Sequence, residues 1–339
     1  MEYSKVKKQY AIRGYKTEEC GNLYAFVIER CLRMIESDGR IGQIIPLPAI
    51  NTRRMVEFQK MLQGWRGNLW ISSYDERPSN LFAGVDQRLS ILVFGDHQDR
   101  ISHIHTTGIN RWRRTERDGL FQSLRYAELQ LPAGYETSAI LKAQDDIETS
   151  ILKKFVKHRP ISSLVTDNPK RDDGVLAYRT AGGRYWKVFL DKPFQTKALS
   201  NKVARLQSGV DAKVLVAALS SDVFWWYYSL HFDMYNLKDY MIFGFRFNYE
   251  GRSILPQLSK LGEKLLRNLD ATAEESAIES RTRGEVRSKL YVVSKSKPII
   301  DAIDRVLAEH YGFTDAELDF IINYDIKYRM GRDAEEDNG

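Results

Sequence analysis

The first part of the chain alternates between helical and strand patterns. Residues 22–37 place apolar side chains three and four positions apart, which is the spacing that lines one face of a helix. Residues 41–45 form a short, nearly continuous apolar run, as expected of a strand buried on both faces of a parallel sheet. Thr52 can cap a second helix that ends near Gln63. Further strand candidates follow at 68–74, 88–94 and 101–107. The alternation predicts an open α/β sheet with covered faces.

The pattern changes near Leu131, where Pro132-Ala133-Gly134 indicates a boundary. Short strand candidates lie at 175–179 and 184–189, and Asp211 can cap a helix that is apolar nearly all round. Beyond Leu255 the chain has charged helices, and Thr314 to Glu317 forms a capping box for another. We therefore expect three segments: 1–130, an α+β segment at 131–255 and a helical segment at 256–339.

Composition predicts a globular protein without a membrane segment. Of the 339 residues, 43% are apolar, enough for a substantial core. The longest apolar runs are far shorter than the roughly 20 residues of a membrane-spanning helix, and no signal-peptide pattern opens the chain, so we expect a cytoplasmic protein. The two cysteines, Cys20 and Cys31, have no CxxC spacing, and we expect neither a disulfide framework nor a metal site.

Positive charge is concentrated in the middle of the chain. Residues 151–214 contain fourteen Lys and Arg against five Asp, whereas the net charge of the whole chain is +6. Such a cluster suits a phosphate backbone, because each neutralised phosphate releases a counterion. The alternative is a solvated basic surface.

Three stretches together resemble a known enzyme family. They are Gly21–Phe26, Asp38–Pro46 and Asn80–Phe94, and their order resembles the segments downstream of the active-site loop in adenine-specific, S-adenosylmethionine-dependent DNA methyltransferases of restriction-modification systems. The chain is most similar to the fused, type IIG-like enzymes, in which methylation and target recognition share one polypeptide. Residues 211–247 and the ending 320–329 resemble the specificity domain and closing segment of the same enzymes.

The resemblance implies the C-terminal half of a Rossmann-like class I methyltransferase sheet, followed by a target-recognition domain and a helical C-terminal segment. In that family a glycine-containing loop holds the cofactor, and an Asn-Pro-Pro-aromatic loop binds the flipped adenine. This sequence contains neither FxGxG nor Asn-Pro-Pro-Tyr. Because methyl transfer needs the amine held in line with the sulfonium, we expect the chain to bind S-adenosylmethionine and to be active only with a separate chain that carries those motifs.

The resemblance also implies roles for four residues of the first segment. Phe82 would stack on the flipped adenine and form one wall of its pocket; alternatively, it packs under its own turn. Asn22, Leu23 and Phe26 would border the adenine of the cofactor; alternatively, they are the cap and core of an amphipathic helix.

Two runs mix basic and aromatic residues and are candidates for contacts with double-stranded DNA. They are Arg111-Trp112-Arg113-Arg114 and Arg184-Tyr185-Trp186-Lys187. Arginine pairs with phosphates and both residue types stack on bases. In the alternative, the first run is a charged connection with its Trp turned inward, and the second is a basic strand facing solvent. The aromatic run 224–228 lies in so apolar a helix that we predict core packing.

Three functions are compatible with these patterns. The first is the C-terminal portion of a DNA adenine methyltransferase, recognising duplex DNA. The second is a stand-alone DNA-binding specificity subunit or a degenerate methyltransferase. The third is a structural remnant with an exposed sheet edge.

Overall fold

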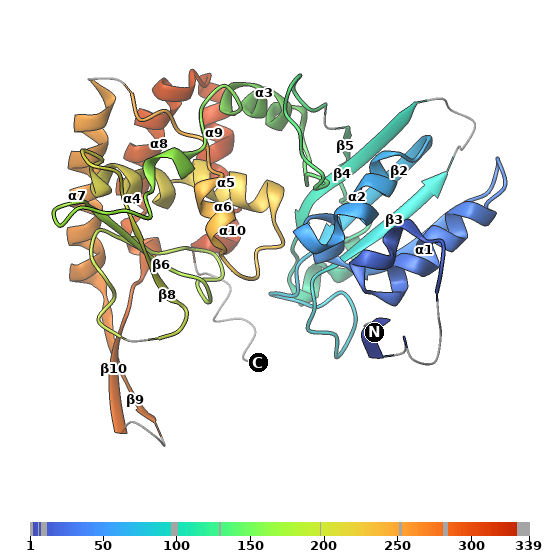
Figure 1. Cartoon of the computed structure of the whole chain (residues 1–339), viewed down its shortest axis with the longest axis horizontal. Helices are drawn as coiled ribbons and strands as arrows, with labels where there is room; N and C mark the ends of the chain where they lie inside the picture. Colours follow the sequence, from blue (N-terminus) through green and yellow to red (C-terminus); the bar gives the residue numbers. More distant parts are fainter. Residues whose placement is uncertain are drawn as a thin grey trace. The chain divides into compact units, whose positions relative to one another are not determined.

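The computed structural model describes residues 3–5, 7, 12–95, 101–128, 130–196, 198–250, 253–280 and 284–330. The chain is mixed α/β and folds into two compact units (Figure 1). The first comprises Met1–Leu152 and Ser229–Asp233, and the second Lys153–Tyr228 and Met234–Gly339. The expected boundaries at 130 and 255 stay a prediction.

A five-stranded mixed sheet forms the first unit. Its strands are β1 (Ile41–Pro46), β2 (Gly67–Tyr74), β3 (Leu89–Gly95), β4 (Ser102–Asn110) and β5 (Ala127–Glu128), in the order β1-β3-β2-β4-β5. β3 is antiparallel to both β1 and β2, so β1 and β2 run in the same direction with β3 between them. β4 is parallel to β2, and β5 is antiparallel to β4. The strand positions agree with the sequence patterns, although the sheet is mixed and not purely parallel.

Two helices lie in front of this sheet in Figure 1, α1 (Leu23–Met34) and α2 (Val56–Gln63). Phe58 and Leu62 of α2 are fully buried, as are Leu69 and Ile71 of β2. The expected cap of the second helix was wrong: α2 begins at Val56 after a short 3-10 turn. The Thr52 hydroxyl instead donates a hydrogen bond to the Pro48 carbonyl at 2.8 Å.

The other face of the sheet is covered at one end by a second core. Tyr74 and Leu89 face each other across β2 and β3, and Leu81, Trp112 and Leu120 pack with them. These three come from the loops that follow β2 and β4. The loops are thereby anchored to the sheet, and this anchoring positions the candidate site.

On this same face, the β1 end of the sheet is much less covered. Ile44 in β1 is 50% exposed and Val93 in β3 is 38% exposed. The apolar run of β1 predicted a strand buried on both faces, and this prediction was wrong for Ile44. β1 is an outer strand, with β3 as its only partner among the described residues.

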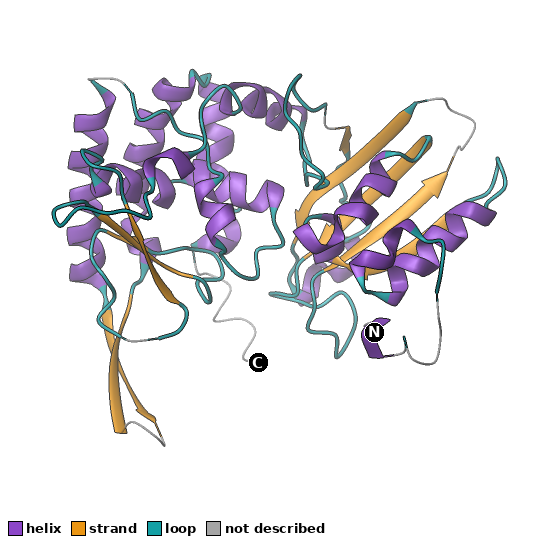
Figure 2. Ribbon diagram, in the orientation of Figure 1, coloured by secondary structure: helices purple, strands orange, loops and turns teal. Residues whose placement is uncertain are grey.

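The second unit packs helices against a three-stranded antiparallel sheet, as the helix and strand colours of Figure 2 show. The strands are β6 (Val175–Arg179), β7 (Phe189–Leu190) and β8 (Asn201–Arg205), in the order β7-β6-β8. A separate hairpin pairs β9 (Glu274–Ser280) with β10 (Gly284–Leu290). The remaining helices are α3 (Asp146–Phe155), α4 (Ala212–Ser220), α5 (Asp222–His231), α6 (Asp239–Phe243), α7 (Ile254–Thr272), α8 (Lys297–Tyr311), α9 (Asp315–Asn323) and α10 (Ile326–Arg329).

Three sequence predictions for these helices are confirmed. The Asp211 carboxylate accepts a hydrogen bond from the Lys213 amide at 2.9 Å and so caps α4. Thr314 and Glu317 form the reciprocal capping box of α9. The aromatic run 224–228 is buried throughout and belongs to the core. Among the helices of the described ranges, none combines the length and the apolar character needed to cross a membrane.

Candidate nucleic-acid interface

Phe82 lies on an exposed turn between β2 and β3. Residues 79–86 form the Phe82 turn. The side-chain amide of Asn80 donates to the Asp86 carboxylate at 2.8 Å, and the backbone amide of Val85 donates to the Phe82 carbonyl at 3.1 Å. Leu81 is buried in the second core and anchors the turn. Phe82 itself is 41% exposed. Its ring is therefore accessible and not packed under the turn, and the stacking role stays a prediction.

A buried carboxylate holds together the ends of the loops that follow β2 and β4. Asp75, directly after β2, accepts hydrogen bonds from Arg88 Nε at 2.8 Å and from Arg111 Nε at 2.7 Å. Arg88 precedes β3 and Arg111 follows β4, and all three side chains are almost fully buried. Such charges are held in the interior by their mutual pairing. The Arg111 guanidinium is thus engaged inside the protein, which favours a structural role for it.

The rest of the first basic run divides between interior and surface. Trp112 is buried and meets the Tyr74 ring edge-on at 6.0 Å between centroids, as the inward-turned alternative predicts. Arg113 is half-buried, and its amide donates to the Glu116 carboxylate at 2.9 Å. Arg114 is exposed. Of this run, Arg114 is the residue best placed for a phosphate contact.

The three residues expected near the cofactor lie at the start of α1. Asn22 does not cap the helix with its side chain, which donates to the Cys20 carbonyl at 3.3 Å. Leu23 is half-buried. Phe26 is buried, with the rings of Tyr3 and Tyr15 edge-on to it at 5.0 and 5.7 Å. Asn22 and Leu23 therefore retain exposed surface, whereas Phe26 is a core residue of this unit.

The second basic run is mostly loop and not the predicted strand, which is limited to Phe189–Leu190. Lys187 is buried, where its ammonium donates to the Gly182 carbonyl at 3.0 Å and lies 5.4 Å from the centre of the Tyr228 ring. Arg184 and Tyr185 are half-buried. Gly182 and Gly183 both adopt positive φ, as the predicted turn requires, but the strand begins later than predicted.

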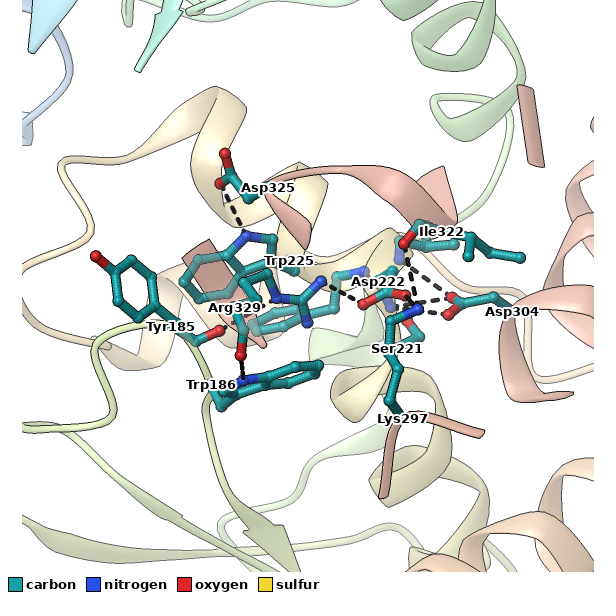
Figure 3. A network of polar contacts seen from close by, with 12 residues as sticks. Tyr185, Trp186, Ser221, Asp222, Trp225, Lys297, Asp304, Ile322, Asp325 and Arg329 are labelled. Atoms are coloured by element: carbon teal, nitrogen blue, oxygen red, sulfur yellow. Dashed lines mark hydrogen bonds and ion pairs between the residues drawn. The ribbon is translucent and has the colours of Figure 1, made fainter. Parts of the chain in front are cut away.

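Trp186 fastens the C-terminal segment to this loop. Its indole donates to the Arg329 carbonyl at 2.7 Å, and the Arg329 guanidinium lies 3.8 Å from the centre of the indole ring (Figure 3). Arg329 Nε also donates to the Tyr185 carbonyl at 3.3 Å. Sequence patterns did not indicate this contact. It shows that Trp186 has a structural role, because its indole binds the end of α10.

Arg329 continues into a buried charge network (Figure 3). It pairs with Asp222, which also lies 3.1 Å from Lys297, and Asp304 accepts the Asp222 amide at 3.0 Å. Burial and the neighbouring Asp222 raise the pKa of Asp304 well above its usual value. Oxygens of Asp222, Asp301 and Asp304 lie within 4.8 Å of one another. Lys297 and Arg329 already supply the positive charge that a cation would bring, so the cluster is a structural ion network.

Most of the remaining basic block is on the surface. Its exposed members are Lys153, Lys157, Arg159, Lys170, Arg171, Lys192, Lys202 and Arg205. Lys192 and Lys202 pair with Asp270 and Asp239 at 2.9 and 3.0 Å. Exposed pairs of this kind contribute little to stability.

The first unit also contains a groove of about 610 Å³. It is lined by α2, β4, β5 and residues 131–141, and the residues that line it include none of those predicted from sequence to contact DNA or cofactor. We assign it no ligand.

Comparison with known proteins finds similarity to solved structures. No family model and no curated protein matches the sequence. Among solved structures, the chain is similar to the cryoEM structure of a DrdV–DNA complex, with 9% identity and a TM-score of 0.36 over 83% of this chain and 43% of that one.

Two further similar structures are Type ISP restriction-modification enzymes. One is ATP-dependent LlaBIII bound to DNA, with 9% identity and a TM-score of 0.34 over 78% of this chain and 28% of that one. The other is a nuclease-deletion mutant of LlaGI with a DNA substrate mimic, with 10% identity and a TM-score of 0.37 over 72% and 36%. The chain spans less than half the length of each of these proteins.

Proposed function

We propose that this chain is the C-terminal portion of a site-specific DNA adenine methyltransferase. It binds duplex DNA, forms one wall of the pocket for a flipped adenine, and acts with a separate chain that supplies the FxGxG and Asn-Pro-Pro-Tyr motifs. S-adenosylmethionine binds only to the combined site, where Asn22 and Leu23 border it.

The observation that carries the proposal is the open β1 end of the sheet. An outer strand presents unpaired backbone groups, and an apolar one such as β1 is a template for a further strand. Ile44 and Val93 leave an apolar surface beside it. On α1, Val27 and Met34 are also exposed and lie seven positions apart, on one side of the helix. An added half-sheet that carries helices on both of its faces would bury these side chains.

Strand order supports the same proposal. In β1-β3-β2, one antiparallel strand separates two strands of common direction. This order fits the last strands of a class I methyltransferase sheet, and the next strand of such a sheet would pair with the free edge of β1.

The accessible candidate residues support DNA as the partner. Phe82 presents an exposed ring at an anchored turn, and Arg114 is an exposed cation on the loop that follows β4. Arg184 and the exposed members of the 151–214 block would contact phosphates, since backbone contacts fix the register of a protein on duplex DNA.

Reconstitution of methyl transfer tests the proposal. The chain is mixed with a polypeptide that carries both missing motifs, and incorporation of labelled methyl into duplex DNA is measured. We expect activity from the mixture and none from either component. Ile44→Asp should reduce it by weakening association, whereas Leu290→Asp, at an exposed apolar position of β10 in the second unit, should leave it unchanged.

The missing motifs favour a second candidate, a DNA-binding specificity subunit that never methylates. The same mixtures separate the two functions. DNA binding without methyl incorporation in any mixture would support the specificity subunit, while restored methylation would exclude it.

A further inference from the structure

The first unit carries exposed aromatic rings, and the proposed function uses only one of them, Phe82. Among the described residues, the strongly exposed aromatic side chains are Phe82, Phe121 and Tyr126. All three lie on the loops that follow β2 and β4. Phe121 is the most accessible, at 51%. A phenylalanine ring held in place at the surface offers an apolar face on which a ligand can stack.

Phe121 is held in a fixed orientation. The buried Tyr74 ring contacts it edge-on at 6.1 Å between centroids, and the Arg117 guanidinium lies 5.7 Å from its centre. Arg117 also donates through Nη2 to the Leu81 carbonyl at 2.8 Å. Leu81 lies directly before Phe82, so Arg117 contacts both the Phe121 ring and the Phe82 turn. The two rings are therefore carried by loops that are fastened to each other.

The surroundings of Phe121 are basic and not apolar. Residues 113–126, the Phe121 segment, contain four arginines and two acids, and one of the acids is used internally, because Glu116 caps the turn that begins at Arg114. The arginines are Arg113, Arg114, Arg117 and Arg125. A ring among cations suits a nucleic acid, whose bases stack on aromatic rings while its phosphates attract arginine.

We propose that Phe121 is a second base-stacking residue, which holds an unpaired base of the bound DNA. The inference rests on the proposed function, since extrusion of a target base creates unpaired bases within a duplex. Phe82 stacks on the extruded adenine, and Phe121 stacks on an unpaired base nearby, while Arg114 and Arg125 contact the flanking phosphates. The stacking is independent of sequence, because every base has a π-face.

The test uses two labelled duplexes of the same sequence. One is fully paired, and the other carries a single 2-aminopurine opposite an abasic site. Binding is followed by fluorescence anisotropy, and stacking by quenching of the 2-aminopurine emission. The proteins are wild type, Phe121→Ala, Phe121→Trp and the control Leu199→Ala, which removes an exposed apolar side chain from the second unit.

We expect Phe121→Ala to weaken binding of the 2-aminopurine duplex by about tenfold and to reduce quenching, in line with roughly 1–3 kcal/mol per stacked base. Binding of the paired duplex should stay within about twofold. Phe121→Trp should retain both signals, which separates stacking from a loss of fold. Equal affinity of wild type and Phe121→Ala for both duplexes, or an equal loss on both, would overturn the inference and leave the proposed function standing. If the wild-type protein bound neither duplex, both this inference and the proposed function would be contradicted.

Discussion

Arg111 and Arg114 belong to one basic run, yet the structure predicts opposite consequences for their loss. Arg111→Met would remove one of the two guanidinium partners that the structure shows at the buried Asp75. Breaking a buried pair costs roughly 3–5 kcal/mol, and because Arg88 remains in place we expect about 3 kcal/mol. For a unit of this size that corresponds to a fall in Tm of roughly 6–12 °C. Affinity for DNA at temperatures where the variant is folded should not change.

Arg114→Met is the matched control at an exposed position of the same run. We expect its Tm to stay within about 1–2 °C of wild type. Its DNA affinity should fall, and the slope of log affinity against log salt should decrease by about 0.9, the value of one phosphate contact. Thermal unfolding and anisotropy titrations at several salt concentrations measure both quantities. The reasoning fails if Arg111→Met reduces the salt slope without lowering Tm. It also fails if Arg114→Met lowers Tm without reducing the salt slope.

Three further predictions concern the interior. Burial lowers the pKa of Lys142 from 10.5 to about 7, so between these two pH values the unfolded chain binds more protons than the folded one. The free energy of unfolding should therefore rise with pH across that window by about 1.4 kcal/mol per pH unit. Urea titrations of Lys142→Met should lack this rise. Trp186→Phe loses the hydrogen bond to Arg329 but keeps an aromatic ring at this position. We expect a loss of about 1 kcal/mol of stability and faster proteolysis of the C-terminal segment. Because the pKa of Asp304 is raised, ionisation of this carboxyl group destabilises the folded state as pH increases. Above pH 4, the Tm of Asp304→Asn should therefore fall less with pH than the Tm of wild type. Parallel plots of Tm against pH for the two proteins would contradict this.

Local patterns predicted elements better than they predicted burial. The caps at Asp211 and Thr314 depend on residues a few positions apart, and both are confirmed. Ile44 was expected to be buried because its run is apolar, but exposure depends on which strands lie beside β1. Periodicity does not contain that information.

The candidate site shows the same limit. Arg111 and Arg114 are three positions apart in one basic run, and only the position of Asp75, far away in sequence, distinguishes them. Phe121 was missed because it lies in a polar stretch without helical or strand periodicity. Its support by Tyr74 and Arg117 is a tertiary contact.

Binding of the chain alone to duplex DNA tests the central claim most directly, because every proposed role requires that contact. Anisotropy of a labelled duplex should show binding at low ionic strength that weakens steeply and log-linearly as salt is added, as expected when several phosphates are neutralised. No binding to any duplex at the lowest salt concentration would contradict the account.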